Sequence, residues 1–320
     1  MNDVRRAERA DDALRLVGIR KRYSRKGPWA LDGLTCRFPR GSVCGLVGPN
    51  GAGKTTMYSV VCGILPPDEG GVDLLGEGPF DPFRLKGRVG VLPQDAEIDD
   101  RRTSREFLHY MGGLQGLGTG AAAAADEALK AVLLEDRADD RVGSLSHGMR
   151  RRLSVASALL GSPELVLLDE PTAGLDPVQA RSLRQVLVDH RGRSTIIVSS
   201  HNLVELERIC DWVVLIEDGV CVQEGPVEEV TGRGQVVDWT VGPGEPPLAA
   251  LREALPEHEW SWTVEGTGGV LTLRAPGDAD LDTSSIVAAR ILADADVAIR
   301  GLQRGRSLEE TFFRSETADD

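Results

Sequence analysis

Between an apolar stretch at 42–47 and a helical pattern at 54–64, the chain has the sequence Gly48-Pro49-Asn50-Gly51-Ala52-Gly53-Lys54-Thr55-Thr56. This sequence satisfies the pattern G-x-x-x-x-G-K-[ST], which is typical of a loop that holds phosphate groups between a strand and a helix. Its glycines would let successive backbone N–H groups converge on phosphate oxygens, where the helix N-terminus adds partial positive charge. We expect Lys54 to reach the β and γ phosphates of a nucleotide and the hydroxyl of Thr55 to bind Mg²⁺.

A later apolar stretch ends in two acidic residues, Leu165-Val166-Leu167-Leu168-Asp169-Glu170. Ligands of α/β sheets bind at the carboxyl ends of the strands, so we expect both carboxylates to lie near the phosphate loop. Because adjacent strand residues point in opposite directions, Asp169 can face Mg²⁺ while Glu170 faces the attacking water. This division predicts Asp169 as a metal ligand and Glu170 as the general base or water-orienting residue.

Composition limits the class of protein. The 320 residues, 41% of them hydrophobic, suffice for one large α/β domain and a smaller one. The net charge of -13 disfavours nucleic acid and anionic lipid as partners, because both attract positive charge. The five cysteines are scattered and form no C-x-x-C pair, which disfavours a disulfide framework or a zinc site and is typical of a reducing compartment.

No segment has the pattern of a signal peptide or a membrane span. Arg5 and Arg6 precede a run of Ala, Asp, Arg and Glu in place of an apolar stretch. The uncharged stretch 107–125 is nearly long enough to cross a membrane, but it contains five glycines and predicts two helix ends with a turn between them. We therefore expect any transport activity to require another polypeptide.

The pattern of apolar residues predicts two domains, 1–230 and 231–320. In the first, antiparallel strands precede the phosphate loop, and a helical block at about 103–160 begins with a capping box of Thr103 and Glu106. Continuous apolar runs at 165–168 and 195–199 predict parallel strands covered by helices on both faces.

The phosphate-type motifs stop near two glycines at 232 and 234. Beyond them the pattern predicts strand, helix, two strands, helix and strand between 235 and 302, the βαββαβ order of a small α+β, ferredoxin-like domain. A last helix at 307–314 would carry Leu308, Phe312 and Phe313 on one face.

With both motifs in place, residues 14–230 resemble the ABC (ATP-binding cassette) ATPase family. The segment Leu145-Ser146-His147-Gly148-Met149 resembles the family signature, usually written LSGGQ, whose serine and backbone contact the γ-phosphate held by the opposite subunit. The resemblance implies this contact for Ser146 and Gly148, which would begin a helix. His147 and Met149 depart from the consensus. With Met149 in its last position, the segment resembles the signature of the subgroup of drug and polysaccharide exporters.

Further residues resemble the motifs of this family one by one. Gln94 resembles the Q-loop glutamine, which contacts Mg²⁺ and water and whose loop meets the membrane partner. Asp176 in Gly174-Leu175-Asp176 resembles the D-loop, and His201 resembles the switch histidine that contacts the γ-phosphate. Tyr23 resembles the aromatic residue that stacks on adenine. The resemblance implies a P-loop NTPase with an antiparallel β subdomain, a RecA-like parallel core and a helical subdomain, and with ATP and Mg²⁺ as ligands.

The ending Ser307-Leu308-Glu309-Glu310-Thr311-Phe312-Phe313 resembles the close of ATPases of ABC-2 type exporters, including the daunorubicin-resistance type. This resemblance implies efflux of a drug, lipid or polysaccharide. The resemblance to the family implies a homodimer, because each signature must complete the site of the other subunit. It also implies an integral membrane permease on a separate chain and a place at the cytoplasmic face of the cell membrane. Nucleic acid is not expected as a partner, and 231–320 would be an accessory, dimerisation or regulatory domain.

Two alternatives remain open. A soluble ABC ATPase acting on the ribosome or on nucleic acid usually has two cassettes, coiled-coil insertions or zinc cysteines, which this sequence lacks. An importer ATPase fits the motifs equally well, but predicts a C-terminal extension that resembles a β-barrel.

Overall fold

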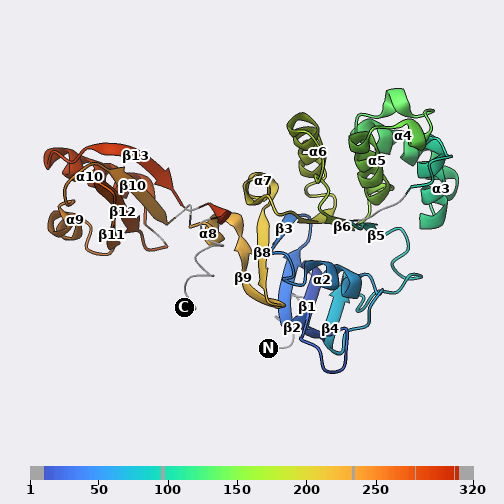
Figure 1. Cartoon of the computed structure of the whole chain (residues 1–320), viewed down its shortest axis with the longest axis horizontal. Coiled ribbons are helices and arrows are strands. Elements are labelled where there is room, and N and C mark those ends of the chain that lie inside the picture. The colour runs from blue at the N-terminus through green and yellow to red at the C-terminus, as the bar shows by residue number, and fades with distance from the viewer. Residues whose placement is uncertain (1–10, 95–97, 233–234, 278, 306, 310–320) are drawn as a thin grey trace. The chain divides into compact units, whose positions relative to one another are not determined.

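A computed structural model of the chain describes residues 11–94, 98–232, 235–277, 279–305 and 307–309. The chain forms two compact units, Met1–Gly225 and Pro226–Asp320 (Figure 1). This division falls a few residues before the boundary that the sequence predicts at 230/231. Most of the predicted terminal helix, with Phe312 and Phe313, lies outside the described residues.

A six-stranded sheet forms the centre of the first unit. Its strands follow the order β5 (Val89–Leu92), β6 (Leu165–Asp169), β7 (Thr195–Ser199), β3 (Val43–Val47), β8 (Trp212–Glu217) and β9 (Val220–Pro226). The first five of these are parallel, and every residue of β3, β6 and β7 is buried. Strands buried on both faces have uninterrupted apolar sequences, which is why the sequence predicts this parallel core.

A three-stranded antiparallel sheet shares its core with the central sheet. It places β1 (Asp12–Lys21) between β2 (Leu31–Pro39) and β4 (Glu69–Leu74). Leu14 and Phe38 of this sheet belong to one apolar cluster with Met57 of helix α2 (Lys54–Val61) and Leu165 of β6. The phosphate loop, which joins β3 to α2, is therefore anchored by packing at both ends.

The helical block consists of α3 (Ser104–Gln115), α4 (Ala121–Ala131) and α5 (His147–Leu159) around their own apolar cluster. The predicted capping box of Thr103 and Glu106 is confirmed. The predicted turn is also confirmed, because α3 ends at Gly116 with φ 87° and a short 3-10 turn precedes α4. Within the described ranges, no helix combines the length and the apolar composition needed to cross a bilayer.

Two more helices of the first unit follow the central strands, α6 (Pro177–Asp189) after β6 and α7 (Leu203–Ile209) after β7. Helix α5 packs against β5 and β6. At Gly90 of β5 the approach is so close that a Cβ atom would lie 1.9 Å from the carbonyl oxygen of Ala158. Glycine is therefore required where the helical block meets the central sheet.

The second unit contains a short helix α8 (Val227–Val230), a four-stranded sheet and two longer helices. The sheet follows the order β11 (Glu259–Glu265), β12 (Gly268–Arg274), β10 (Val236–Val241) and β13 (Ile299–Arg304), with every neighbouring pair antiparallel. Helices α9 (Leu248–Ala254) and α10 (Leu281–Asp294) contribute to one core with the sheet, in which the rings of Trp239 and Trp260 stack with centroids 6.1 Å apart. The first and third strands lie in the middle, so the predicted βαββαβ topology is confirmed.

Candidate nucleotide site

The phosphate loop takes a backbone shape that its glycines permit. Gly53, immediately before α2, has φ 103°, and a Cβ atom there would lie 2.6 Å from the carbonyl oxygen of Ala30. Gly51 also has a left-handed φ, of 88°. L side chains seldom adopt such angles, so the motif needs glycine at both positions. The loop therefore places the N-terminus of α2, with the N–H groups that have no partner within the helix, at the carboxyl end of β3.

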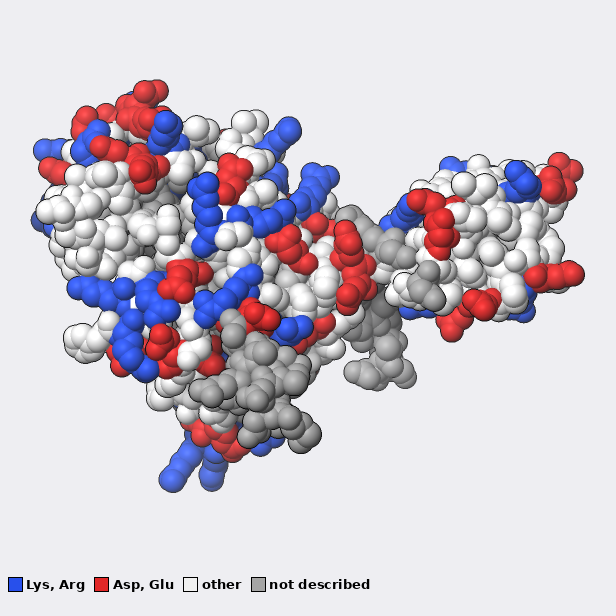
Figure 2. All heavy atoms as spheres, turned by 180° about the vertical axis from the view of Figure 1, so that it is seen from behind, with Lys and Arg blue, Asp and Glu red and all other residues white. Residues whose placement is uncertain are grey.

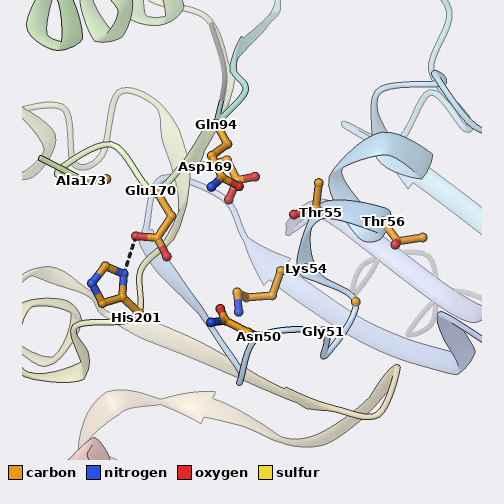
Figure 3. Close-up of a pocket in the computed structure, with 11 residues that line it drawn as sticks. Asn50, Gly51, Lys54, Thr55, Thr56, Gln94, Asp169, Glu170, Ala173 and His201 are labelled. Atoms are coloured by element: carbon orange, nitrogen blue, oxygen red, sulfur yellow. Dashed lines mark hydrogen bonds and ion pairs between the residues drawn. The ribbon is translucent and has the colours of Figure 1, made fainter. Parts of the chain in front are cut away.

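A polar pocket of about 310 Å³ lies beside this loop (Figure 3). It joins the phosphate loop to the residues that follow β5, β6 and β7. Its lining consists of Asn50, Gly51, Gly53, Lys54, Thr55, Thr56, Gln94, Asp169, Glu170, Ala173 and His201. The structure thus brings together most of the residues that the sequence predicts for one nucleotide site, from four segments far apart in the chain.

Three residues of the loop do not line the pocket. The carbonyl oxygens of Gly48 and Pro49 accept hydrogen bonds from Lys54 Nζ at 2.6 and 2.9 Å. Ala52 is buried, and its N–H donates to the carbonyl of Pro49. These residues fix the shape of the loop and the position of the lysine.

The two acidic residues differ in backbone conformation. Strand β6 ends at Asp169, whereas Glu170 has φ 49° and belongs to the turn that follows. The sequence predicts that strand alternation separates the two carboxylates. This reason is wrong, because Glu170 does not belong to the strand. The carboxylates still point apart in Figure 3, with Asp169 beside Gln94 and Glu170 directed at His201. A left-handed turn, unusual for a residue other than glycine, produces this separation.

Hydrogen bonds hold both acids in place. Ser199 Oγ donates to Asp169 Oδ1 at 2.5 Å and accepts from the N–H of Glu170 at 3.0 Å. Glu170 Oε2 lies 2.9 Å from His201 Nδ1. The side chain of Glu170 is 15% exposed and that of His201 is 76% exposed. A largely buried carboxylate thus meets an exposed imidazole at the pocket.

Lys54 carries the positive charge of the pocket. Burial lowers the pKa of Lys54, and the carboxylates of Glu170 and Asp169 act in the opposite direction. These carboxylates favour the ammonium form, which is the form that pairs with phosphate.

The pocket offers oxygen ligands suited to Mg²⁺. Among the described residues, no group of three His, Cys, Asp or Glu side chains could hold a metal ion. Thr55, Gln94 and Asp169 instead offer hydroxyl, amide and carboxylate oxygens around one pocket. Mg²⁺ is usually bound by one or two carboxylates together with water and substrate phosphates, so this ligand set fits an ion that arrives with a nucleotide.

The signature segment lies outside this pocket. Ser146 caps α5, and its side chain accepts a hydrogen bond from the N–H of Met149 at 3.3 Å. His147 lies against Gly174, where a Cβ atom would meet His147 Nε2 at 2.8 Å. A Cβ on buried Gly148 would meet Gln179 Oε1 at 2.0 Å. The segment therefore packs on the loop before α6 and on the first turn of α6 in the same chain.

Asp176 and Tyr23 also lie outside the lining of the pocket. Asp176 caps α6 by accepting hydrogen bonds from the N–H groups of Val178 and Gln179, both at 2.9 Å. Tyr23 is 70% exposed, and its hydroxyl lies 3.0 Å from Thr56 Oγ1. The tyrosine thus stands beside the end of the phosphate loop with its ring open to solvent.

Comparison with known proteins agrees with this geometry. Residues 31–173 match the family described as ABC transporter. The Nod factor export ATP-binding protein I of Ralstonia nicotianae is 36% identical in an alignment of 313 positions that covers 94% of this chain and 92% of that protein. The chain belongs to the ABC transporter family. It is an ATP-binding cassette of this family, which supports the transporter ATPase and not the soluble ATPase of ribosomes or nucleic acid.

Other relatives of this ABC ATPase match two thirds of the chain or more. A daunorubicin resistance ATP-binding protein of Streptomyces coeruleorubidus is 38% identical over 227 residues, 69% of this chain and 70% of that protein. A solved dimeric cassette in a post-hydrolysis state, bound to ADP and Pi, has a TM-score of 0.61 at 23% identity, covering 67% of this chain and 98% of that chain. CbiO1 of Clostridium perfringens has a TM-score of 0.61 at 26% identity, covering 77% and 96%. The predicted ABC fold is confirmed.

Sequence reasoning did not identify two residues that contact the acid pair of this ABC ATPase. Ser199 ends the buried strand β7, and a polar residue at such a position is a usable signal. Arg151 is buried, while its neighbours Arg150 and Arg152 are partly exposed. Three consecutive arginines give no sign of which one faces the interior, so the structure was needed to single out Arg151.

Proposed function

We propose that this chain is the ATP-hydrolysing subunit of an exporter. The observation that carries the proposal is the pocket that joins Lys54 to the acid pair and His201, in a chain related along nearly its whole length to an export ATP-binding protein. In this proposal two copies enclose the nucleotides between them, and hydrolysis drives efflux through an integral membrane permease on a separate chain. The ATPase would lie at the cytoplasmic face of the membrane, attached through that permease.

In the proposed complex with ATP, the phosphate loop binds the triphosphate. Backbone N–H groups from Asn50 to Thr56 and the ammonium of Lys54 would contact phosphate oxygens. Thr55, Gln94 and Asp169 would hold Mg²⁺, which when bound offsets the negative charge of the β and γ phosphates. The exposed ring of Tyr23 would stack on the adenine.

Glu170 is the proposed general base. Its carboxylate lines the pocket and is held by His201, while its backbone N–H is held by Ser199. A carboxylate fixed in this way can orient a water molecule and accept its proton. His201 would keep the carboxylate in place and contact the γ-phosphate, because the exposed imidazole can turn between these two partners.

The second copy supplies the remaining contacts. Because Ser146, His147, Gly148 and Met149 do not line the pocket of their own chain, we propose that this segment meets the γ-phosphate in the partner's pocket. The capped N-terminus of α5 is a suitable anion site, since its N–H groups and helix dipole favour negative charge. Asp176, at the N-terminus of α6, would lie at the same dimer contact.

Efflux of a drug, lipid or polysaccharide is the proposed transport activity. The relatives that support it are named for Nod factor export and for daunorubicin resistance. Nucleic acid is not a proposed partner, because the net charge is -13 and Figure 2 shows acidic and basic side chains intermixed on the viewed face of each unit.

Co-expression with the permease tests the proposed exporter. The full chain and the integral membrane protein encoded beside it should copurify from detergent-solubilised membranes, and ATP-dependent efflux should depend on Lys54. Recovery of the chain only with ribosomes or nucleic acid, despite normal ATP hydrolysis, would overturn the proposal.

We further propose that the second unit supports or regulates the ATPase dimer and contributes no nucleotide ligand. Among the residues that the structure describes, none that lines the pocket belongs to this unit. A chain ending at Val230 should therefore bind ATP normally, while its dimerisation or its coupling to the permease weakens. Loss of ATP binding in a shortened chain that circular dichroism shows to be folded would contradict this division.

A further inference from the structure

Arg151 connects the helix that begins at the signature to the turn that holds the proposed general base. It is 9% exposed and lies on α5, in the second turn after the cap Ser146. Its guanidinium donates to four backbone carbonyl oxygens, those of Asp169 at 2.6 Å, Glu170 at 2.7 Å, Gln94 at 3.1 Å and Pro171 at 3.3 Å. One side chain thus joins the backbones of two segments that line the pocket.

The two shortest of these bonds determine the conformation of Glu170. One goes to the peptide group before Glu170 and the other to the peptide group after it, so the guanidinium holds both groups that define the φ and ψ of this residue. Glu170 has φ 49°, a conformation that non-glycine residues avoid unless the surroundings impose it. The direction of the Glu170 carboxylate therefore depends on Arg151 as well as on His201 and Ser199.

The chemistry of arginine suits this task. A guanidinium carries five N–H donors in a rigid planar fork and stays protonated, whereas an ammonium is a compact charge with three donors. Lysine at this position could reach one carbonyl or two, but it could not span carbonyls that belong to separate segments. A charged fork buried against backbone oxygens also remains fixed, because each of its three nitrogens donates to a carbonyl that it would lose on moving.

The neighbouring arginines do not share this arrangement. Arg150 donates to the carbonyls of Leu145 and Gly143, and Arg152 donates to those of Val132 and Leu133. All four acceptors belong to the helical block and its connections. Arg151 is therefore the member of the triplet that reaches the catalytic turn.

We propose that Arg151 is a positioning residue for ATP hydrolysis, which holds the turn of Glu170 and the backbone of Gln94 at a fixed place relative to the signature helix α5. This inference rests on the proposed function, in which Glu170 orients the attacking water. It assigns no contact with ATP to Arg151. The side chain acts on hydrolysis through the backbone of Glu170.

Steady-state ATPase assays and ATP titration of the full chain test this role. Arg151→Lys should lower kcat by about 100-fold, because a displacement of about 1 Å in a reacting group has an effect of that order. Affinity for ATP should stay within about threefold of wild type, because no nucleotide contact is removed. The matched control is Arg150→Lys, the same change one residue earlier on α5, which should alter kcat by about twofold at most. Circular dichroism and Tm measured on both variants establish that each is folded.

Two further variants separate the possible results. Glu170→Gln combined with Arg151→Lys should turn over ATP no more slowly than Glu170→Gln alone, since both changes affect the same step. Wild-type turnover in Glu170→Gln would refute the proposed role of Glu170 as the general base, on which this inference rests. If Glu170→Gln loses activity while Arg151→Lys and Arg151→Gln keep wild-type kcat, only the inference on Arg151 is overturned. It is equally overturned if both Arg151 variants are unfolded, or lose ATP affinity and kcat in parallel, since Arg151 would then serve stability alone.

Discussion

The nucleotide pocket of the first unit and the tryptophan core of the second unit differ in how their polar groups are paired. Around the pocket of the first unit, Ser199, Arg151 and His201 hold the acid pair through hydrogen bonds. In the core of the second unit, the indole N–H groups of Trp239 and Trp260 have no hydrogen-bond partner among the described residues. A catalytic site requires particular residue types at particular spacings, whereas a hydrophobic core requires only apolar side chains of suitable volume in a suitable sequence pattern. The sequence therefore reveals the task of the first unit and only the topology of the second.

The largest effect is expected in the hydrophobic core of the second unit. Trp239 is fully buried, so Trp239→Ala should lower the free energy of unfolding of this unit by about 3–5 kcal/mol. Chemical denaturation followed by circular dichroism would measure the change. ATP binding measured by calorimetry should be unaffected. If this variant loses ATP binding while its first unit stays folded, the two units are not independent.

In the first unit, the corresponding prediction is that a substitution lowers ATP turnover and leaves the unit folded. Glu170→Gln keeps the size of the side chain and removes the base, so turnover should fall by about 10²–10⁴-fold. Binding of Mg-ATP should persist, and an ATP-dependent dimer should accumulate. Size-exclusion chromatography with and without ATP shows the dimer. A variant that hydrolyses ATP at the wild-type rate would exclude Glu170 as the catalytic base.

Binding depends on a different residue of the same pocket. Lys54→Ala removes a charge-assisted contact to phosphate and should weaken ATP binding by roughly 1.5–3 kcal/mol. Isothermal titration calorimetry measures the loss. Lys86→Ala is the matched control, because Lys86 lies in the same unit and does not line the pocket. Equal ATP affinity in the two variants would contradict the assignment of the phosphate loop.

The smallest effect is expected at the signature. His147→Gly restores the family consensus and should change the ATPase rate by less than about tenfold, or about 1.4 kcal/mol. The proposed contacts of this segment use the hydroxyl of Ser146 and backbone N–H groups, and the imidazole lies on Gly174 of its own chain. A change greater than tenfold in either direction would show that His147 takes part in the reaction.

Much of this architecture could be predicted because local patterns determine it. The uninterrupted apolar runs of β6 and β7 indicated buried parallel strands, and Thr103 with Glu106 indicated where α3 begins. The turn at Glu170 could not be predicted, because a left-handed φ outside glycine has no sequence marker. The role of Arg151 was equally hidden. Successive helical residues are about 100° apart, so one face of α5 becomes the interior only when the helix packs on β5 and β6.

The stacked tryptophans of the second unit have an optical consequence. Trp239 and Trp260 lie with ring centroids 6.1 Å apart and planes inclined by 24°. At such a separation the electronic transitions of two indoles couple, and a coupled pair in a chiral setting produces a circular dichroism couplet that an isolated indole does not. The chain has five tryptophans, three of them in this unit. The couplet therefore reports on the fold of the second unit specifically, and any rearrangement of that core during the ATP cycle would become visible without an added label.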